Sequence, residues 1–167
     1  MKTLLTLVFA LMLNGAVAQS SNPNLNAQLE QMKTYFLAED FDNFANYTYP
    51  KILELMGGKT NLVQASQQSM QQMKSEGFEV LDLQFKDASG FLEKAGEKQC
   101  TVTQQITMKT PQGTVQSEYS LIGISSDNGA NWTFMDTSGK SKATMLQYFP
   151  NLHPDLEIKP KTQQFLD

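Results

Sequence analysis

In the first half of the chain, apolar side chains recur at the spacing of a helix. The first stripe consists of Leu25, Leu29, Met32 and Phe36, at intervals of four, three and four residues. Helical spacing continues over residues 41–47, and Pro50 suits the first turn of a short helix over 51–56. Thr60 is a suitable N-cap for a longer helix that ends near Glu76. The pattern therefore predicts helices from residue 25 to Gly77.

After Gly77 the period changes to two, which is typical of half-buried strands. Strands are expected over 78–85, 91–92, 100–108, 115–124 and 131–136. In the first of them, Leu81, Leu83 and Phe85 share one face, opposite Val80 and Asp82. In the clearest one, Cys100, Val102, Gln104, Ile106 and Met108 share one face, opposite Thr101, Thr103, Gln105 and Thr107.

Turn residues separate these strands and predict an antiparallel arrangement. Thr110–Gly113 and Asp127–Gly129 are typical hairpin connections, and a closing helix is expected over 140–149. Helices followed by hairpin-linked strands indicate an α+β domain over 25–149, with N-terminal helices packed on a strongly curved antiparallel sheet. Residues 19–24 are expected to be a flexible lead. Residues 150–167, with three prolines, are expected to be an irregular tail.

The first 18 residues have the pattern of a secretory signal peptide: one lysine, a short apolar run and a small-residue site ending at Ala18. Cleavage is expected between Ala18 and Gln19. The apolar run is shorter than the about 20 residues of a membrane span, and no second run of that kind follows. We therefore expect an exported protein, periplasmic or extracellular, without a membrane span after cleavage.

Composition narrows the classes of function. Lys and Arg together number 13 against 17 Asp and Glu, and every one of these basic residues is lysine. Without arginine or a basic stripe, nucleic-acid binding is not expected. Cys100 is the single cysteine, expected as a small core residue on a strand, and no intramolecular disulfide can form. His153 is the single histidine and has no ligand partner nearby in the sequence, so neither a metal site nor a cofactor is expected.

Two segments carry a resemblance to a known family: the acidic-aromatic step Asp40-Phe41-Asp42-Asn43-Phe44 and the strand Trp132-Thr133-Phe134-Met135-Asp136. With the order of elements from residue 25 to 138, the chain resembles the nuclear transport factor 2-like superfamily, also called cystatin-like α+β barrels. It looks like a small exported bacterial member. The resemblance implies a cone-shaped fold with a pocket, but no single reaction, since this superfamily includes isomerases, dehydratases and binding modules.

The resemblance also directs attention to particular side chains. Enzymes of the superfamily use an Asp, a Tyr or a His inside the cone. No histidine lies in the region of the barrel here, so a His–Asp dehydratase pair is absent. An arrangement of Asp and Tyr, as in isomerases, stays open.

Asp136 is the best candidate for an acid or base, since by alternation it shares a face with Trp132 and Phe134. The alternative is that Asp136, or one of the two residues after it, caps the next helix. The candidate ligand-binding residues are Tyr47, Tyr49, Gln104, Tyr119 and Trp132. For each of these the alternative is packing with a local hydrogen bond.

Three functions follow as hypotheses. The first is non-enzymatic binding of a small apolar ligand, or of a protein partner, through the cone or the sheet face. The second is a cofactor-independent lyase or isomerase that uses Asp136 and a tyrosine. The third is a structural or dimerisation module, in which two copies pair through their sheets. A buried carboxylate beside a tyrosine would favour the second, an open apolar cavity the first, and a filled cone the third.

Overall fold

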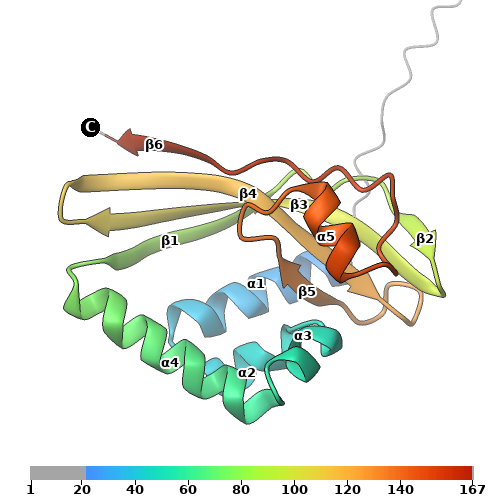
Figure 1. Ribbon diagram of the computed structural model, residues 1–167, viewed down its shortest axis with the longest axis horizontal. Coiled ribbons are helices and arrows are strands. Elements are labelled where there is room, and N and C mark those ends of the chain that lie inside the picture. The colour runs from blue at the N-terminus through green and yellow to red at the C-terminus, as the bar shows by residue number, and fades with distance from the viewer. Residues whose placement is uncertain (1–21, 167) are drawn as a thin grey trace, which may run out of the picture.

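The computed structural model describes residues 22–166, and the expected signal peptide with its cleavage site at Ala18 and Gln19 lies outside them. The helices are α1 (Pro23–Leu37), α2 (Phe41–Phe44), the 3₁₀ turn η1 (Ala45–Tyr47), α3 (Pro50–Leu55), α4 (Lys59–Ser75) and α5 (Lys142–Tyr148). The strands are β1 (Glu79–Lys86), β2 (Leu92–Lys94), β3 (Glu97–Thr110), β4 (Gly113–Ser125), β5 (Thr133–Asp136) and β6 (Thr162–Leu166). The expected α+β class is confirmed. Helices α1 to α4 lie together on one side of the sheet (Figure 1).

Helix α1 begins earlier than the sequence pattern predicts. Asn22 is its N-cap: the Asn22 side chain accepts a hydrogen bond from Leu25 N at 3.0 Å, and Pro23 occupies the first turn. Residues 22–24, which belong to the expected flexible lead, are therefore ordered in the structure. Leu25, Leu29 and Met32 are buried, as the helical stripe predicts.

The six strands form one antiparallel sheet that is not closed. The main path is β1-β3-β4-β5, while β2 pairs with β3 and β6 pairs with β4. β3 and β4 are long and joined by the two-residue turn that Thr110–Gly113 predicts. A parallel bridge between Thr48 and Phe134 ties the end of the helical block to β5.

The alternation expected for β1 is wrong at one position. The register of β1 against β3 shifts between Val80 and Asp82, which is a β-bulge at Leu81. Because the extra residue reverses the alternation, Leu81 is 47% exposed, while Val80 packs against the helices and Leu83 is buried. Period-two counting cannot foresee such an insertion.

Residues 150–166 differ from the expected irregular tail. Leu152 and Leu156 are 0% and 1% exposed and pack with Ile122, Ile124 and Met145. The chain then returns to the sheet as β6, antiparallel to β4. The prolines stop helix formation, but the apolar residues between them complete a second core beside α5. Within residues 22–166, no helix has the length and apolar character that crossing a membrane requires.

Candidate functional site

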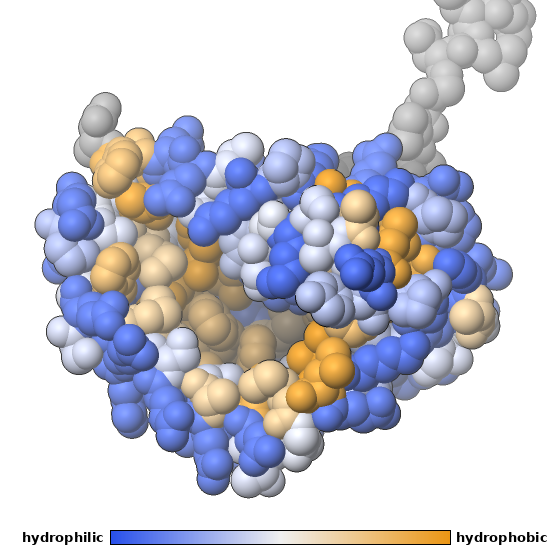
Figure 2. Space-filling view, viewed as in Figure 1, coloured by the Kyte–Doolittle hydropathy of each residue, from blue (hydrophilic) through white to orange (hydrophobic). Residues whose placement is uncertain are grey.

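A cavity of about 530 Å³ lies between the helices and the sheet. Figure 2 shows it as a hollow that opens on this face of the molecule, with apolar residues along its floor and rim. This volume falls within the range typical of small-molecule sites, roughly 300–1,000 Å³. The helices and the sheet therefore leave open space inside the fold rather than filling it with side chains.

The walls of the cavity are mostly apolar and come from elements far apart in the sequence. The helical side contributes Met32, Phe36, Phe44, Ile52 and Leu62. The sheet contributes Leu83, Ile106, Leu121 and Phe134, and α5 contributes Met145. Leu55 and Tyr148 also line the cavity and are 72% and 65% exposed. These two side chains are solvent-accessible apolar surface that is continuous with the cavity.

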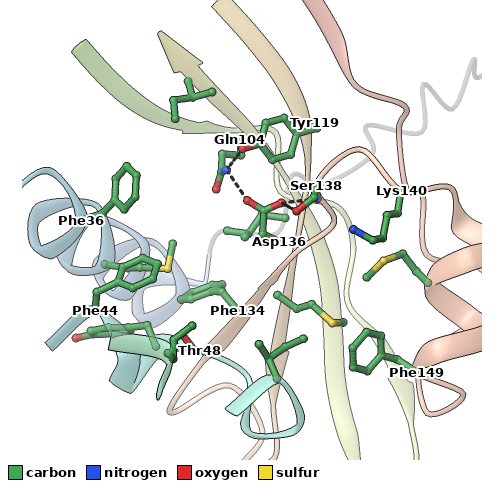
Figure 3. A pocket seen from close by; sticks show the side chains of 18 of the residues that line it. Phe36, Phe44, Thr48, Gln104, Tyr119, Phe134, Asp136, Ser138, Lys140 and Phe149 are labelled. Atoms are coloured by element: carbon green, nitrogen blue, oxygen red, sulfur yellow. Dashed lines mark hydrogen bonds between the residues drawn. The ribbon is translucent and has the colours of Figure 1, made fainter. Parts of the chain in front are cut away.

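Three polar side chains converge on one part of this apolar cavity. Gln104 on β3 donates from Nε2 to Tyr119 Oη at 2.8 Å and to Asp136 Oδ2 at 3.2 Å. Figure 3 shows the three side chains meeting between β3, β4 and the end of β5. Gln104 and Tyr119 face each other in the β3–β4 register. Leu121 pairs with Asp136, so adjacent strands bring the three residues together.

Both oxygens of the Asp136 carboxylate accept hydrogen bonds. Oδ1 accepts from Ser138 N and, at 3.3 Å, from Ser138 Oγ. Oδ2 accepts from Gln104 Nε2, and the Tyr119 ring lies close enough for the carboxylate charge to act on its hydroxyl. A carboxylate offers about four acceptor positions. Asp136 is exposed rather than buried, so the expectation that it would be desolvated with Trp132 and Phe134 is wrong. Asp136 nevertheless lines the cavity.

The Tyr119 hydroxyl keeps its proton at neutral pH. Burial raises the pKa of Tyr119 to about 12, and the negative charge of Asp136 and the hydrogen bond to it act in the same direction. An amide nitrogen can only donate, so the hydroxyl oxygen accepts from Gln104 Nε2. The direction of each hydrogen bond in the cluster is thereby fixed.

Four of the six candidate residues line the cavity: Tyr47, Gln104, Tyr119 and Asp136. Tyr47 contributes its ring, while its hydroxyl donates to Gln31 Oε1 at 2.6 Å. The capping alternative for Asp136 does not hold, because Ser141 is the N-cap of α5. Asp136 instead binds the backbone of Ser138, which has a positive φ of 50°.

Trp132 and Tyr49 lie outside the lining of this cavity. Trp132 precedes β5, is 2% exposed, stacks on Phe91 with ring centroids 5.4 Å apart and donates from Nε1 to Gly129 O at 3.1 Å. Tyr49 donates to Glu97 Oε1 at 2.9 Å and accepts from Asn151 Nδ2 at 2.8 Å. Burial and Glu97 raise the pKa of Tyr49 to about 12. Both side chains are satisfied by local partners, as the packing alternative describes.

Sequence reasoning missed most of the apolar lining and three polar residues, Thr48, Ser138 and Lys140. The stripe that contains Met32 and Phe36 marked the inner face of α1, and this signal could have placed Phe36 in the cavity. For Ser138 and Lys140 no signal was present, because they lie in an irregular turn whose course depends on Asp136.

Cys100 is completely buried, and burial raises the pKa of its thiol to about 12. Such a thiol is a core residue, as its position on a strand predicts. Within residues 22–166, no three His, Cys, Asp or Glu side chains are grouped so that they could hold a metal ion.

Comparison of the sequence with models of known protein families found no match, and no curated protein matches it.

Proposed function

We propose that this protein binds a small apolar ligand in the cavity between its helices and its sheet. The observation that carries the proposal is the open cavity of about 530 Å³ with apolar walls and one polar cluster. This combination is typical of sites for small molecules, in which apolar walls supply affinity and a few polar groups fix orientation. A protein partner bound at the sheet face and a homodimer are the remaining alternatives.

We also propose that the sheet and helices enclose this space as a cone and that the chain is a member of the nuclear transport factor 2-like superfamily. The order of elements and a cavity beneath the sheet support this assignment. The N-terminal pattern further supports export in a bacterium, to the periplasm or beyond the cell. Superfamily membership and export are both predictions that start from the sequence.

The hydrogen bonds at the polar cluster favour binding over catalysis. A general base needs a carboxylate oxygen that can accept a proton from the substrate. In this cavity both oxygens of Asp136 already accept from protein donors, on Ser138 and Gln104. The meeting of Asp136 and Tyr119 is nevertheless the one observation that favours the second candidate function, a cofactor-independent lyase or isomerase.

The binding proposal can be tested with N-phenyl-1-naphthylamine, a neutral probe whose fluorescence rises in apolar sites. Ile106→Trp places a larger side chain in the cavity, and we expect it to weaken binding by about tenfold or more. Thr107→Trp is the matched control, because the next residue of β3 faces the opposite side of the sheet. Saturable binding that both variants leave unchanged would place the probe elsewhere and refute the proposal.

A further inference from the structure

In the polar cluster, the side-chain oxygen of Gln104 is an acceptor without a hydrogen-bond partner in the described part of the chain. Gln104 is 7% exposed as a residue. Its Nε2 is used twice, for Tyr119 and for Asp136. Within residues 22–166, no donor bonds to Oε1. Figure 3 shows this oxygen turned away from Tyr119 and Asp136 and toward the cavity.

The neighbours of Gln104 determine which end of its amide faces the cavity. An ionised carboxylate can only accept, so Asp136 requires a donor from Gln104. The Tyr119 hydroxyl can accept as well as donate, so it does not oppose this orientation. A flipped amide would bring Oε1 against the carboxylate oxygen, with two acceptors facing each other. The charge of Asp136 therefore holds Nε2 toward the carboxylate. Oε1 is left facing the cavity, where a ligand can bond to it.

We propose, resting on the binding function above, that the cavity selects apolar molecules whose polar end donates a hydrogen bond, and that the ligand is an alcohol. Oε1 is open to the cavity in the free protein, and a ligand that shields it from water without bonding to it incurs a cost of about 1–3 kcal/mol. A hydroxyl provides the missing donor to Gln104 Oε1. A ketone or ether on the same carbon skeleton offers only an acceptor and leaves Oε1 unpaired. Sites that hydrogen-bond a substrate hydroxyl discriminate on this ground.

The test compares 2-decanol with 2-decanone, which share a carbon skeleton and differ in the donor. Dissociation constants are measured by isothermal titration on the mature chain. We expect 2-decanol to bind at least about fivefold more tightly, the ratio expected from one net hydrogen bond. Equal binding, or tighter binding of the ketone, would overturn this inference and leave the proposed function standing. Binding of neither molecule would contradict the proposed function itself.

Two variants locate the cause of the preference. Gln104→Leu removes the acceptor, and we expect the two affinities to become equal within about twofold. Gln105→Leu is the matched control on the opposite face of β3, where its amide pairs with Glu118 at 2.6 Å, and it should keep the preference. If Gln104→Leu retains the preference, Oε1 is not the discriminating atom and the inference fails.

Asp136→Asn tests the role of the charge and provides a second readout. An asparagine can donate to Gln104 Oε1, so the amide is free to flip and present Nε2 to the cavity. We expect 2-decanone to gain affinity in this variant. The preference for 2-decanol over 2-decanone should therefore fall below the wild-type value. An unchanged ratio in a folded variant would show that Asp136 does not set the orientation of the amide and would contradict that step.

Discussion

Gln104 Nε2 lies 3.2 Å from Asp136 Oδ2, although 32 residues separate the two in sequence. The contact joins β3 to the end of β5 across β4, and Tyr119 on β4 accepts the second proton of the same nitrogen. The three side chains therefore form one unit in which Gln104 donates to both partners. A change at any of the three should be felt at the other two.

The free energy of unfolding is expected to fall as the pH rises from about 9 to about 12. The pKa of Tyr119 and that of Tyr49 are raised from 10 to about 12, and that of Cys100 from 9 to about 12. Between those values the unfolded chain loses protons that the native protein retains, so folding weakens with pH. Denaturant unfolding at several pH values measures this dependence.

Tyr119→Phe is the control for the alkaline transition. The phenylalanine ring keeps the packing but cannot ionise, so the loss of stability between pH 10 and 12 should be smaller than in the wild type. The lysines titrate in both proteins and cancel in the comparison. Identical slopes would show that the Tyr119 hydroxyl is not held in its neutral form by burial and Asp136.

Leu156→Ala is expected to destabilise the protein by about 2–5 kcal/mol, the usual cost of truncating a buried leucine. Leu156 is 1% exposed and packs in the second core with Leu152 and Met145. Leu166→Ala is the matched control, since Leu166 is 37% exposed at the end of β6, and it should cost about 0.5 kcal/mol or less. Urea unfolding gives both values. Equal effects would argue against a folded role for residues 150–158.

Cys100 should be unreactive toward a thiol reagent such as dithiobis(nitrobenzoic acid) in the native protein at pH 8. The thiolate is the reacting form, and both burial and the raised pKa suppress it. In denaturant the same thiol should react at the rate of a free cysteine. Rapid reaction of the native protein would show that the strand opens more readily than its position between α1 and β4 allows.

Local pattern was sufficient for most elements of the fold, but not for β6. The stripe of Leu25, Leu29 and Met32 marked α1, and the turn at Thr110–Gly113 marked the β3–β4 hairpin, because helix period and turn chemistry are properties of neighbouring residues. The bulge at Leu81 and the buried course of 150–158 were missed, since each depends on contacts with distant strands. A pattern of neighbours carries no information about such contacts.

For the candidate site, too, local pattern identified single residues but not the contacts between distant strands. Gln104, Tyr119 and Asp136 could be named because each is a polar residue on a strand face shared with apolar ones. Their convergence depends on the register of three strands, which no local motif specifies. Trp132 was expected on the face of Asp136 by alternation, but β5 begins at Thr133, so alternation does not extend to the tryptophan.

The most direct test of the central claim is an NMR titration of the methionine methyl groups with N-phenyl-1-naphthylamine. Met32, Met135 and Met145 line the cavity, whereas Met70 and Met108 do not. Ring currents of a bound probe should shift the first three signals saturably, at one dissociation constant, and leave the other two in place. Shifts of all five alike, or shifts confined to Met70 and Met108, would contradict a ligand site between the helices and the sheet.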